Sequence, residues 1–282
     1  MANIQAQVQL YSDEFIEGFE QRNSKLGATV TRQGIVKGNQ YTFLVVGSNG
    51  QVAKTRGTNG KIPVQTDDET QVTVTLAEYH DKRQKTNFNV FAGQSDQRRI
   101  MQLNSMAVIN RTQDLQILDE LANCTQTVSN TAATASLEMV LTAKTGLTNN
   151  EVPNDGNISA VITAGFEADL MKLPEFTSAD YVTDKKLEKA PTEFNWMGVH
   201  FIVSSLITGV GTASELCYMY HKSAIGYGID RQGISVHGGY NDEEDYYWTR
   251  TSFFANPKLI QNEGIVLMKH IGTTYALDTV TA

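Results

Sequence analysis

The longest periodic pattern of apolar positions in the chain lies between about Ser95 and Asn123. This stretch contains no proline or glycine and is rich in residues that favour helices. Its apolar residues, at about 100° per residue, cover a broad arc; they are Ile100, Leu103, Ala107, Val108, Leu115, Ile117, Leu118, Leu121 and Ala122. Ser95 and Asp96 suit the N-terminal end of a helix. The pattern predicts a helix of roughly 40 Å that contacts protein on most of its circumference.

The first forty residues contain little that can pack. Residues 3–21 show a short helical pattern, whose apolar members are Val8, Phe15, Ile16 and Phe19. Residues 22–40 are polar and include three glycines. Such an arm cannot bury enough of its own surface to offset its ordering entropy. We therefore expect a partner subunit to hold it.

The next segment has the pattern of a hairpin. Residues 41–47 are β-forming and end in the turn sequence Ser48-Asn49-Gly50. Residues 72–76 alternate apolar and polar side chains, which is typical of a strand with one buried face. We predict a long two-stranded excursion over residues 41–80, with a flexible, polar tip. An isolated hairpin is only marginally stable in water, so this one also requires a neighbour.

The second half alternates between strand and helix patterns. We expect helices at 137–146, 164–173 and 221–229, and strands at 160–164, 197–206, 215–220, 233–236, 246–254 and 265–268. This is the α+β class, with one compact domain in the second half and long extensions in the first.

Composition and charge exclude several classes of protein. The 282 residues are 40% hydrophobic and 19% charged, which is typical of globular proteins. No apolar run approaches a membrane span, and the N-terminus lacks a secretory signal, so we expect a cytosolic chain with reduced Cys124 and Cys217. From Thr131 onward there are 10 basic and 18 acidic residues, against 13 and 13 before it. An acidic second half argues against a protein that grips nucleic acid through phosphates.

Candidate catalytic chemistry is weak. There is no GxSxG motif, P-loop or HExxH motif, and the five histidines are scattered, which indicates structural or surface roles. The acidic run 242–245 suits a solvated turn or, alternatively, a calcium or magnesium site. The aromatic residues around Trp248 suit sheet packing or, alternatively, a platform for stacking bases. We expect no catalytic, cofactor-binding or metal-binding residues.

Two groups of charged residues are interface candidates. Arg111 and Asp114 lie three apart inside the apolar arc of the long helix, so they can form an ion pair that fixes the helix on its support. A catalytic Arg/Asp couple is the alternative. Lys54, Arg56 and Lys61 form a small basic patch near the hairpin tip, which serves either solubility or pairing with an acidic surface of a neighbour.

The order of these parts resembles the major capsid protein of tailed bacteriophages, whose shell fold is shared with encapsulins and the herpesvirus capsid floor. Asn110 to Leu118 is similar to the family's Arg-x-x-Asp-x-x-Ile on its spine helix. Further segments resemble, in order, the axial-domain strand and helix, the strand after a Gly-containing turn, the family's HK-Ala-Ile segment and the final strand; they are 160–181, 197–205, 221–226 and 264–270.

The resemblance implies a structural protein rather than an enzyme. Its implied parts are an N-terminal arm (1–40), an extended loop (41–88), a peripheral domain with the spine helix (89–135, completed by about 240–282) and an axial domain (136–240). Copies would assemble into hexamers and pentamers of an icosahedral shell, in the host bacterial cytoplasm, around double-stranded DNA contacted non-specifically. A separate scaffolding protein, a portal and cement proteins are further implied partners; no membrane and no cofactor are implied.

Three alternatives remain open from the sequence. The first is an encapsulin-like compartment, which would enclose a cargo enzyme instead of a genome. The second is a hydrolase that uses the neighbourhood of His237 or of the acidic run. The third is a sugar- or receptor-binding decoration protein, although such proteins seldom carry a spine helix with these extensions.

Overall fold

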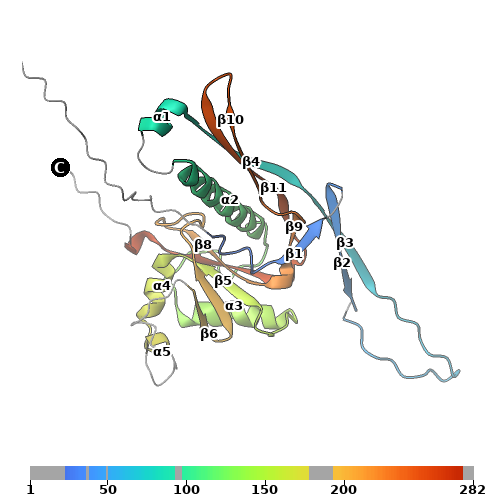
Figure 1. Ribbon diagram of the computed structural model, residues 1–282. Coiled ribbons are helices and arrows are strands. Elements are labelled where there is room, and N and C mark those ends of the chain that lie inside the picture. The colour runs from blue at the N-terminus through green and yellow to red at the C-terminus, as the bar shows by residue number, and fades with distance from the viewer. Residues whose placement is uncertain (1–22, 36–37, 49, 93–96, 178–192, 276–282) are drawn as a thin grey trace, which may run out of the picture. The chain divides into compact units, whose positions relative to one another are not determined.

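The computed structural model describes residues 23–35, 38–48, 50–92, 97–177 and 193–275. The chain divides into two compact units, and Figure 1 labels their helices and strands. Of the described residues, unit 1 contains those within 23–24, 78–113 and 232–254, and unit 2 contains those within 25–77, 114–231 and 255–275. The boundaries of arm, loop, peripheral and axial domain stay a prediction.

Unit 1 combines the first part of the long helix with a small antiparallel sheet. Its elements are β4 (Ala77–Thr86), α1 (Asn87–Ala92), α2 (Gln97–Leu121), β10 (Ser235–Asn241) and β11 (Tyr246–Leu259), of which β4, α2 and β11 extend into unit 2. β11 pairs antiparallel with β10 and also pairs with β4. Ser105 of α2 donates a 2.8 Å hydrogen bond to the Thr251 hydroxyl of β11, and both residues are buried. The helix is therefore fixed to the sheet by a buried polar contact as well as by apolar packing.

Unit 2 is built on a mixed sheet with the strand order β12-β8-β5-β7-β6. The strands are β5 (Ile158–Ile162), β6 (Glu193–Trp196), β7 (Val199–Val203), β8 (Glu215–His221) and β12 (Ile265–His270). All five residues of central β5 are buried, which explains its unbroken run of small and apolar side chains. The helices α3 (Leu137–Asn149) and α4 (Ala164–Met171) contribute to the same core, and the short α5 (Pro174–Thr177) follows them.

The α+β class and most of the predicted elements are confirmed. The long helix begins and ends within two residues of its predicted limits, although Ser95 and Asp96 lie outside the described residues. The predicted strands at 160–164, 215–220, 246–254 and 265–268 correspond to β5, β8, β11 and β12. The helical pattern over residues 3–21 also lies outside the described part of the chain.

The expectation that residues 22–40 contain little that packs is wrong for part of the arm. Leu26, Val30 and Ile35 have exposed fractions of 0%, 1% and 6%. Residues of β1 (Thr31–Ile35) pair in parallel with β9 (Ile225–Asp230) within unit 2. A few buried apolar side chains are enough to hold β1 in place, because its backbone N–H and C=O groups form hydrogen bonds with the neighbouring strand β9. This part of the arm is therefore held by its own chain.

The predicted helix over residues 221–229 is also wrong. β8 ends at His221, a single 3-10 turn follows over Lys222–Ala224, and β9 then begins. Ile225, Tyr227 and Ile229 alternate with two glycines, so the true period is two, and glycine disfavours a helix. Two smaller corrections concern α3, which continues three residues past Gly146, and the strand predicted at 197–206, which is shorter: residues 197–198 form a turn, and only β7 (Val199–Val203) lies within the predicted range.

Candidate functional site

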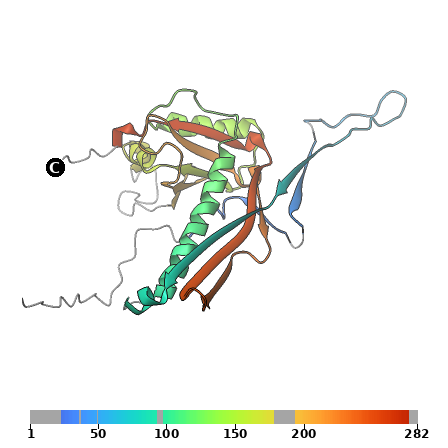
Figure 2. The ribbon, with the colours of Figure 1, turned by 90° about the horizontal axis from the view of Figure 1, so that it is seen from above.

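The most distinctive feature of unit 2 is a projecting hairpin. β2 (Gln40–Gly47) and β3 (Asp68–Thr75) pair antiparallel as a separate two-stranded sheet. Beyond these strands, residues 48 and 50–67 continue away from the sheets of unit 2, as Figures 1 and 2 both show. The predicted two-stranded excursion is therefore present.

The two faces of the hairpin differ. Phe43 and Val45 are half-buried, whereas Leu44 and Val46, which point to the opposite face, are 56% and 55% exposed. Across the ladder, Leu44 lies opposite Gln71 and Val46 opposite Glu69. One face therefore packs towards the body of the unit, and the other presents apolar side chains to solvent.

The tip of the excursion is held by side-chain amides. Gln51 Nε2 donates to the Thr66 carbonyl and Gln65 Nε2 donates to the Val52 carbonyl, each over 2.9 Å. The turn itself is closed by the Gly57 amide, which donates to the Lys61 carbonyl over 3.0 Å. These bonds keep the two extended segments side by side after the strand ladder has ended.

The prediction of a polar tip is wrong in composition. Val52, Ile62 and Val64 are 77%, 67% and 91% exposed. Exposed apolar side chains that recur along a narrow projection indicate a contact surface. Lys54, Arg56 and Lys61 are also exposed at the tip, so the predicted basic patch lies among apolar residues.

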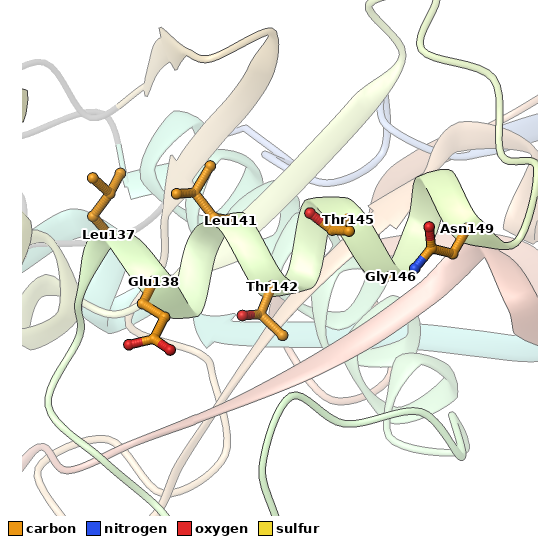
Figure 3. Close-up of a pocket in the computed structure, with 7 residues that line it drawn as sticks. All are labelled: Leu137, Glu138, Leu141, Thr142, Thr145, Gly146 and Asn149. Carbon is orange, nitrogen blue, oxygen red and sulfur yellow. The ribbon is translucent and has the colours of Figure 1, made fainter.

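The outer face of α3 carries a second candidate contact surface. Figure 3 shows Leu137, Leu141 and Thr145 along one side of the helix, with Glu138 and Thr142 on the adjoining side. These residues line a shallow groove of about 580 Å³, and Leu141 is 43% exposed. The groove contains one ionisable side chain, so its chemistry favours protein contact over catalysis.

The strongest cluster of titratable groups lies at one end of the large sheet of unit 2. His270 is fully buried, with Nδ1 at 2.7 Å from Glu215 Oε2 and Nε2 at 2.9 Å from Asp169 Oδ2. The imidazole of His270 therefore lies between two buried carboxylates and joins β12, β8 and α4.

Each carboxylate of this cluster has further donors. Glu215 accepts from the Thr163 hydroxyl and, over 2.8 Å, from the Gly211 amide. Asp169 accepts from the Tyr275 hydroxyl and, over 3.0 Å, from Lys172 Nζ. These donors satisfy the lone pairs that a buried ion pair would otherwise leave unpaired, so the cluster stabilises the fold.

The hydrogen bonds of the cluster also set the pKa values of its acids. Burial alone would raise the pKa of Asp169, but donation from His270, Tyr275 and Lys172 outweighs it and leaves the pKa below its ordinary value of 3.8. Burial likewise opposes donation from Thr163, His270 and Gly211 at Glu215, and its pKa is also lowered, from 4.5. Both acids are therefore charged in the folded protein near neutral pH.

Unit 2 should consequently lose stability in acid. Because both pKa values are lower in the folded state, the unfolded chain binds more protons, so the contribution is complete above about pH 5 and falls as the pH drops through 4.5 and 3.8 towards the lowered values. Urea unfolding at pH 7, 5, 4 and 3 measures this, with Trp196 as the probe of unit 2 in a Trp248→Phe background. Asp169→Asn should weaken the dependence of the free energy of unfolding on pH. An unchanged dependence would contradict the assignment of the acid sensitivity to this cluster.

A second histidine, at the end of β8, has a capping role. His221 Nδ1 accepts from the Ser223 amide over 3.3 Å and lies 2.7 Å from its hydroxyl, so Nε2 carries the proton that faces Asp155 Oδ1 at 3.1 Å. Hydrogen bonds from the side chain and backbone of Asn157 and from His221 lower the pKa of Asp155 to about 2. The side chains of Ser223, His221 and Asp155 thus lie in a row. The lone pair on His221 Nδ1, however, accepts the hydrogen bond that caps the turn leading to β9.

The sequence-predicted site residues are dispersed. Asp114 accepts the backbone amides of Lys25 and Leu26 over 3.0 and 3.1 Å, so it fixes the arm to the end of α2. Its predicted pairing with Arg111 stays a prediction, as do the interface roles of the three basic tip residues.

The acidic run lies in a turn, and the aromatic strand packs within a sheet. Residues 242–245 form the exposed turn between β10 and β11, where the Tyr240 hydroxyl donates to Asp245. Trp248 lies opposite Gly239, and a Cβ on Gly239 would lie 3.1 Å from its indole ring. Trp248 therefore covers a glycine of the neighbouring strand. Within the described ranges, no three His, Cys, Asp or Glu residues are arranged to hold a metal ion, and no helix is long and apolar enough to cross a membrane.

The sequence alone does not predict the His270 cluster. Its members are separated by 46 and 55 residues, and no short motif in the sequence links them. The available signal was a histidine at the end of the apolar strand 265–270, together with Gly272, where a Cβ would lie 1.9 Å from Glu215 Oε1. Neither observation identifies the partners without the fold.

Comparison with known families shows what kind of protein has this architecture. Residues 4–271 match the model of a family described as phage capsid protein. The chain belongs to this family. The sequence-based assignment to the major capsid proteins of tailed phages is confirmed, and so is a structural role in the virion capsid.

Solved structures share the fold of this capsid protein. A chain of Mycobacterium phage Che8 is 20% identical, with a TM-score of 0.75 and coverage of 95% of this chain and 98% of that chain. The capsid structure of cyanophage P-SCSP1u is 10% identical, with a TM-score of 0.75 and coverage of 94% and 93%. A virus-like particle from Pyrococcus furiosus is 11% identical, with a TM-score of 0.57 and coverage of 88% and 92%. A search of curated proteins gives no match to this capsid protein.

Proposed function

We propose that copies of this capsid protein assemble into hexamers and pentamers that close an icosahedral shell around the double-stranded DNA of a tailed phage. The observation that carries the proposal is the projecting hairpin of unit 2. It buries one face at its base and leaves Leu44, Val46 and the apolar tip residues in solvent. A neighbouring copy is the partner that would cover this surface in every subunit of a shell.

The energetics favour many small contacts over one large contact. Burial of apolar surface contributes about 25 cal/mol per Å² before the costs of association. A hairpin that lies on a neighbour makes a modest contribution per copy, but each subunit both donates and receives one such contact. The N-terminal arm, for which residues 1–22 lie outside the described ranges, is proposed to add a second intersubunit contact.

The charge distribution is consistent with a container for DNA. An acidic second half lets packaged DNA remain loosely held, because few counterions are released by contact with such a surface. The basic tip residues are proposed to pair with an acidic surface of a neighbouring copy. A separate scaffolding protein, a portal and cement proteins are proposed as further partners, assembly is proposed to occur in the bacterial cytoplasm, and no catalytic activity is proposed.

An encapsulin-like compartment is the weaker candidate. Residues 4–271 match a phage capsid family, and the Pyrococcus furiosus particle has a lower TM-score than the phage chains. The content of purified particles separates the two functions: a shell of a phage encloses DNA, and a compartment encloses a cargo protein.

Negative-stain electron microscopy of the expressed chain, with and without the scaffolding protein of the same phage, tests the proposal. We expect closed particles of uniform size built from six-fold and five-fold units. Limited trypsin digestion should cleave the free subunit at Lys54, Arg56 or Lys61 and spare these sites in particles. A protease-resistant monomer at high concentration, with its hairpin ordered on its own body, would overturn the proposal.

A further inference from the structure

The base of the hairpin rests on β9, whose sequence alternates large residues with glycines. Ile225 and Tyr227 are fully buried, and Gly226 and Gly228 lie on the opposite face of the strand. The Tyr227 hydroxyl donates to Gln116 Oε1 of α2 over 3.2 Å, so the large residues face the helix. The glycine face is the one that meets the hairpin.

Close approach explains both glycines. A Cβ on Gly226 would lie 2.6 Å from Phe43 Cε2 and 2.6 Å from Ile260 Cδ1; a Cβ on Gly228 would lie 3.2 Å from Val74 Cγ1. Neither glycine has a positive φ, so the backbone conformation is open to any residue. Their missing side chains therefore make room for Phe43 of β2 and Val74 of β3.

From this geometry we infer that Gly226 and Gly228 are positioning residues that set the direction in which the hairpin leaves unit 2. The inference rests on the proposed function, because it adds that the same direction determines whether neighbouring copies can close a shell. The two glycines form a shallow seat in β9, and the side chains of Phe43 and Val74 occupy it.

The seat cannot yield, because β9 is fixed on both edges. β1 pairs with it in parallel on one side, and residues 255–259 of β11 pair with it antiparallel on the other. The hairpin has fewer attachments to the body. At its base, Asn256 Nδ2 donates to the Thr75 carbonyl over 2.9 Å. A side chain added to the seat therefore displaces the hairpin rather than β9.

The length of the hairpin amplifies such a displacement. Gly226 and Gly228 are about 7 Å apart, and the tip lies about 40 Å or more from the seat, at about 3.3 Å per extended residue. Raising one end of the seat by about 1 Å turns the hairpin by about 8° and moves the tip by about 5 Å on the same geometry. A shift of this size is comparable with a whole side chain, so the tip would miss its contact on a neighbour.

Spin-label distances on the soluble subunit test the seat directly. Labels at Thr58→Cys in the tip and Thr148→Cys on α3, in a Cys124→Ser background, report the position of the hairpin relative to its own unit. We expect Gly226→Ala to shift this distance by several ångströms. Gly238→Ala is the matched control, since that strand glycine has only ordinary contacts of 3.4 and 3.6 Å around its Cβ position and no positive φ; it should leave the distance unchanged.

Compensating substitutions distinguish a positioning role from general destabilisation of the fold. Phe43→Leu and Ile260→Val remove atoms that the new Cβ meets, so adding them to Gly226→Ala should restore the wild-type distance between the labels. If the site were only structural, the three substitutions would each lower the stability further and would not restore the distance. An unchanged distance in a folded Gly226→Ala variant would overturn the inference. If that variant does not fold, folding of the rescued variant supports the inference and its failure to fold overturns it.

Shell formation then tests the second half of the inference. Gly226→Ala should give particles of altered size or none, and the rescued variant should restore them. Normal particles from a variant with a displaced tip would overturn the link to assembly. If the wild-type chain forms no particles, the proposed function fails, but the spin-label result still decides whether the glycines position the hairpin.

Discussion

Replacing His270 by alanine is expected to lower the free energy of unfolding of unit 2 by about 3–5 kcal/mol. The side chain is fully buried, and both of its ring nitrogens face buried carboxylates. Its removal takes one buried hydrogen-bond partner from each of Asp169 and Glu215, at the junction of β12, β8 and α4. The cavity left by the imidazole adds to the loss.

Urea unfolding followed by the fluorescence of Trp196 measures this effect, again in a Trp248→Phe background. The matched control is His200→Ala. His200 is 33% exposed and lies 3.6 Å from Glu193, a surface contact whose loss should cost less than about 1 kcal/mol. Equal losses for the two histidines would contradict the role assigned to the buried cluster.

Replacing Val52, Ile62 and Val64 together by serine is expected to leave the subunit folded and to raise the concentration at which shells form by about hundredfold or more. These residues are 77%, 67% and 91% exposed, so the monomer loses little by their replacement. An intersubunit contact that buries them loses about 3 kcal/mol after association costs, and 1.4 kcal/mol corresponds to a factor of ten.

Light scattering against subunit concentration measures the threshold, and thermal unfolding verifies the monomer. The control keeps the three positions apolar, as Val52→Ile, Ile62→Val and Val64→Ile, and should assemble at nearly the wild-type concentration. If the serine variant assembles at the wild-type concentration, the tip is not a contact surface.

Elements whose apolar residues recur at a regular spacing can be predicted from the local sequence. α2 was predicted within two residues because 25 residues without proline or glycine leave few alternatives. β5 was predicted because its five buried residues are consecutive. The hairpin was predicted from a turn sequence and one alternating strand. In each of these cases, the information lies within one short window of the chain.

Contacts between distant segments were not predictable in this way. His270 has partners at positions 169 and 215, and nothing near any of the three identifies the others. β1 carries only one buried apolar residue, and its pairing with β9 depends on a strand almost 200 residues away. The local sequence of β9 wrongly predicts a helix, because the role of Gly226, clearance for Phe43, becomes visible only when the hairpin is in place.

The pairing of β1 with β9 has a consequence for synthesis on the ribosome. Residues 31–35 are translated early, but their partner strand at 225–230 and the β11 segment beyond it emerge near the end of the chain. At about 5–20 residues per second, the first strand waits for roughly ten seconds or longer before it can pair. A nascent or prematurely terminated polypeptide therefore lacks a finished seat for its hairpin, and we expect such chains to be excluded from the growing particle.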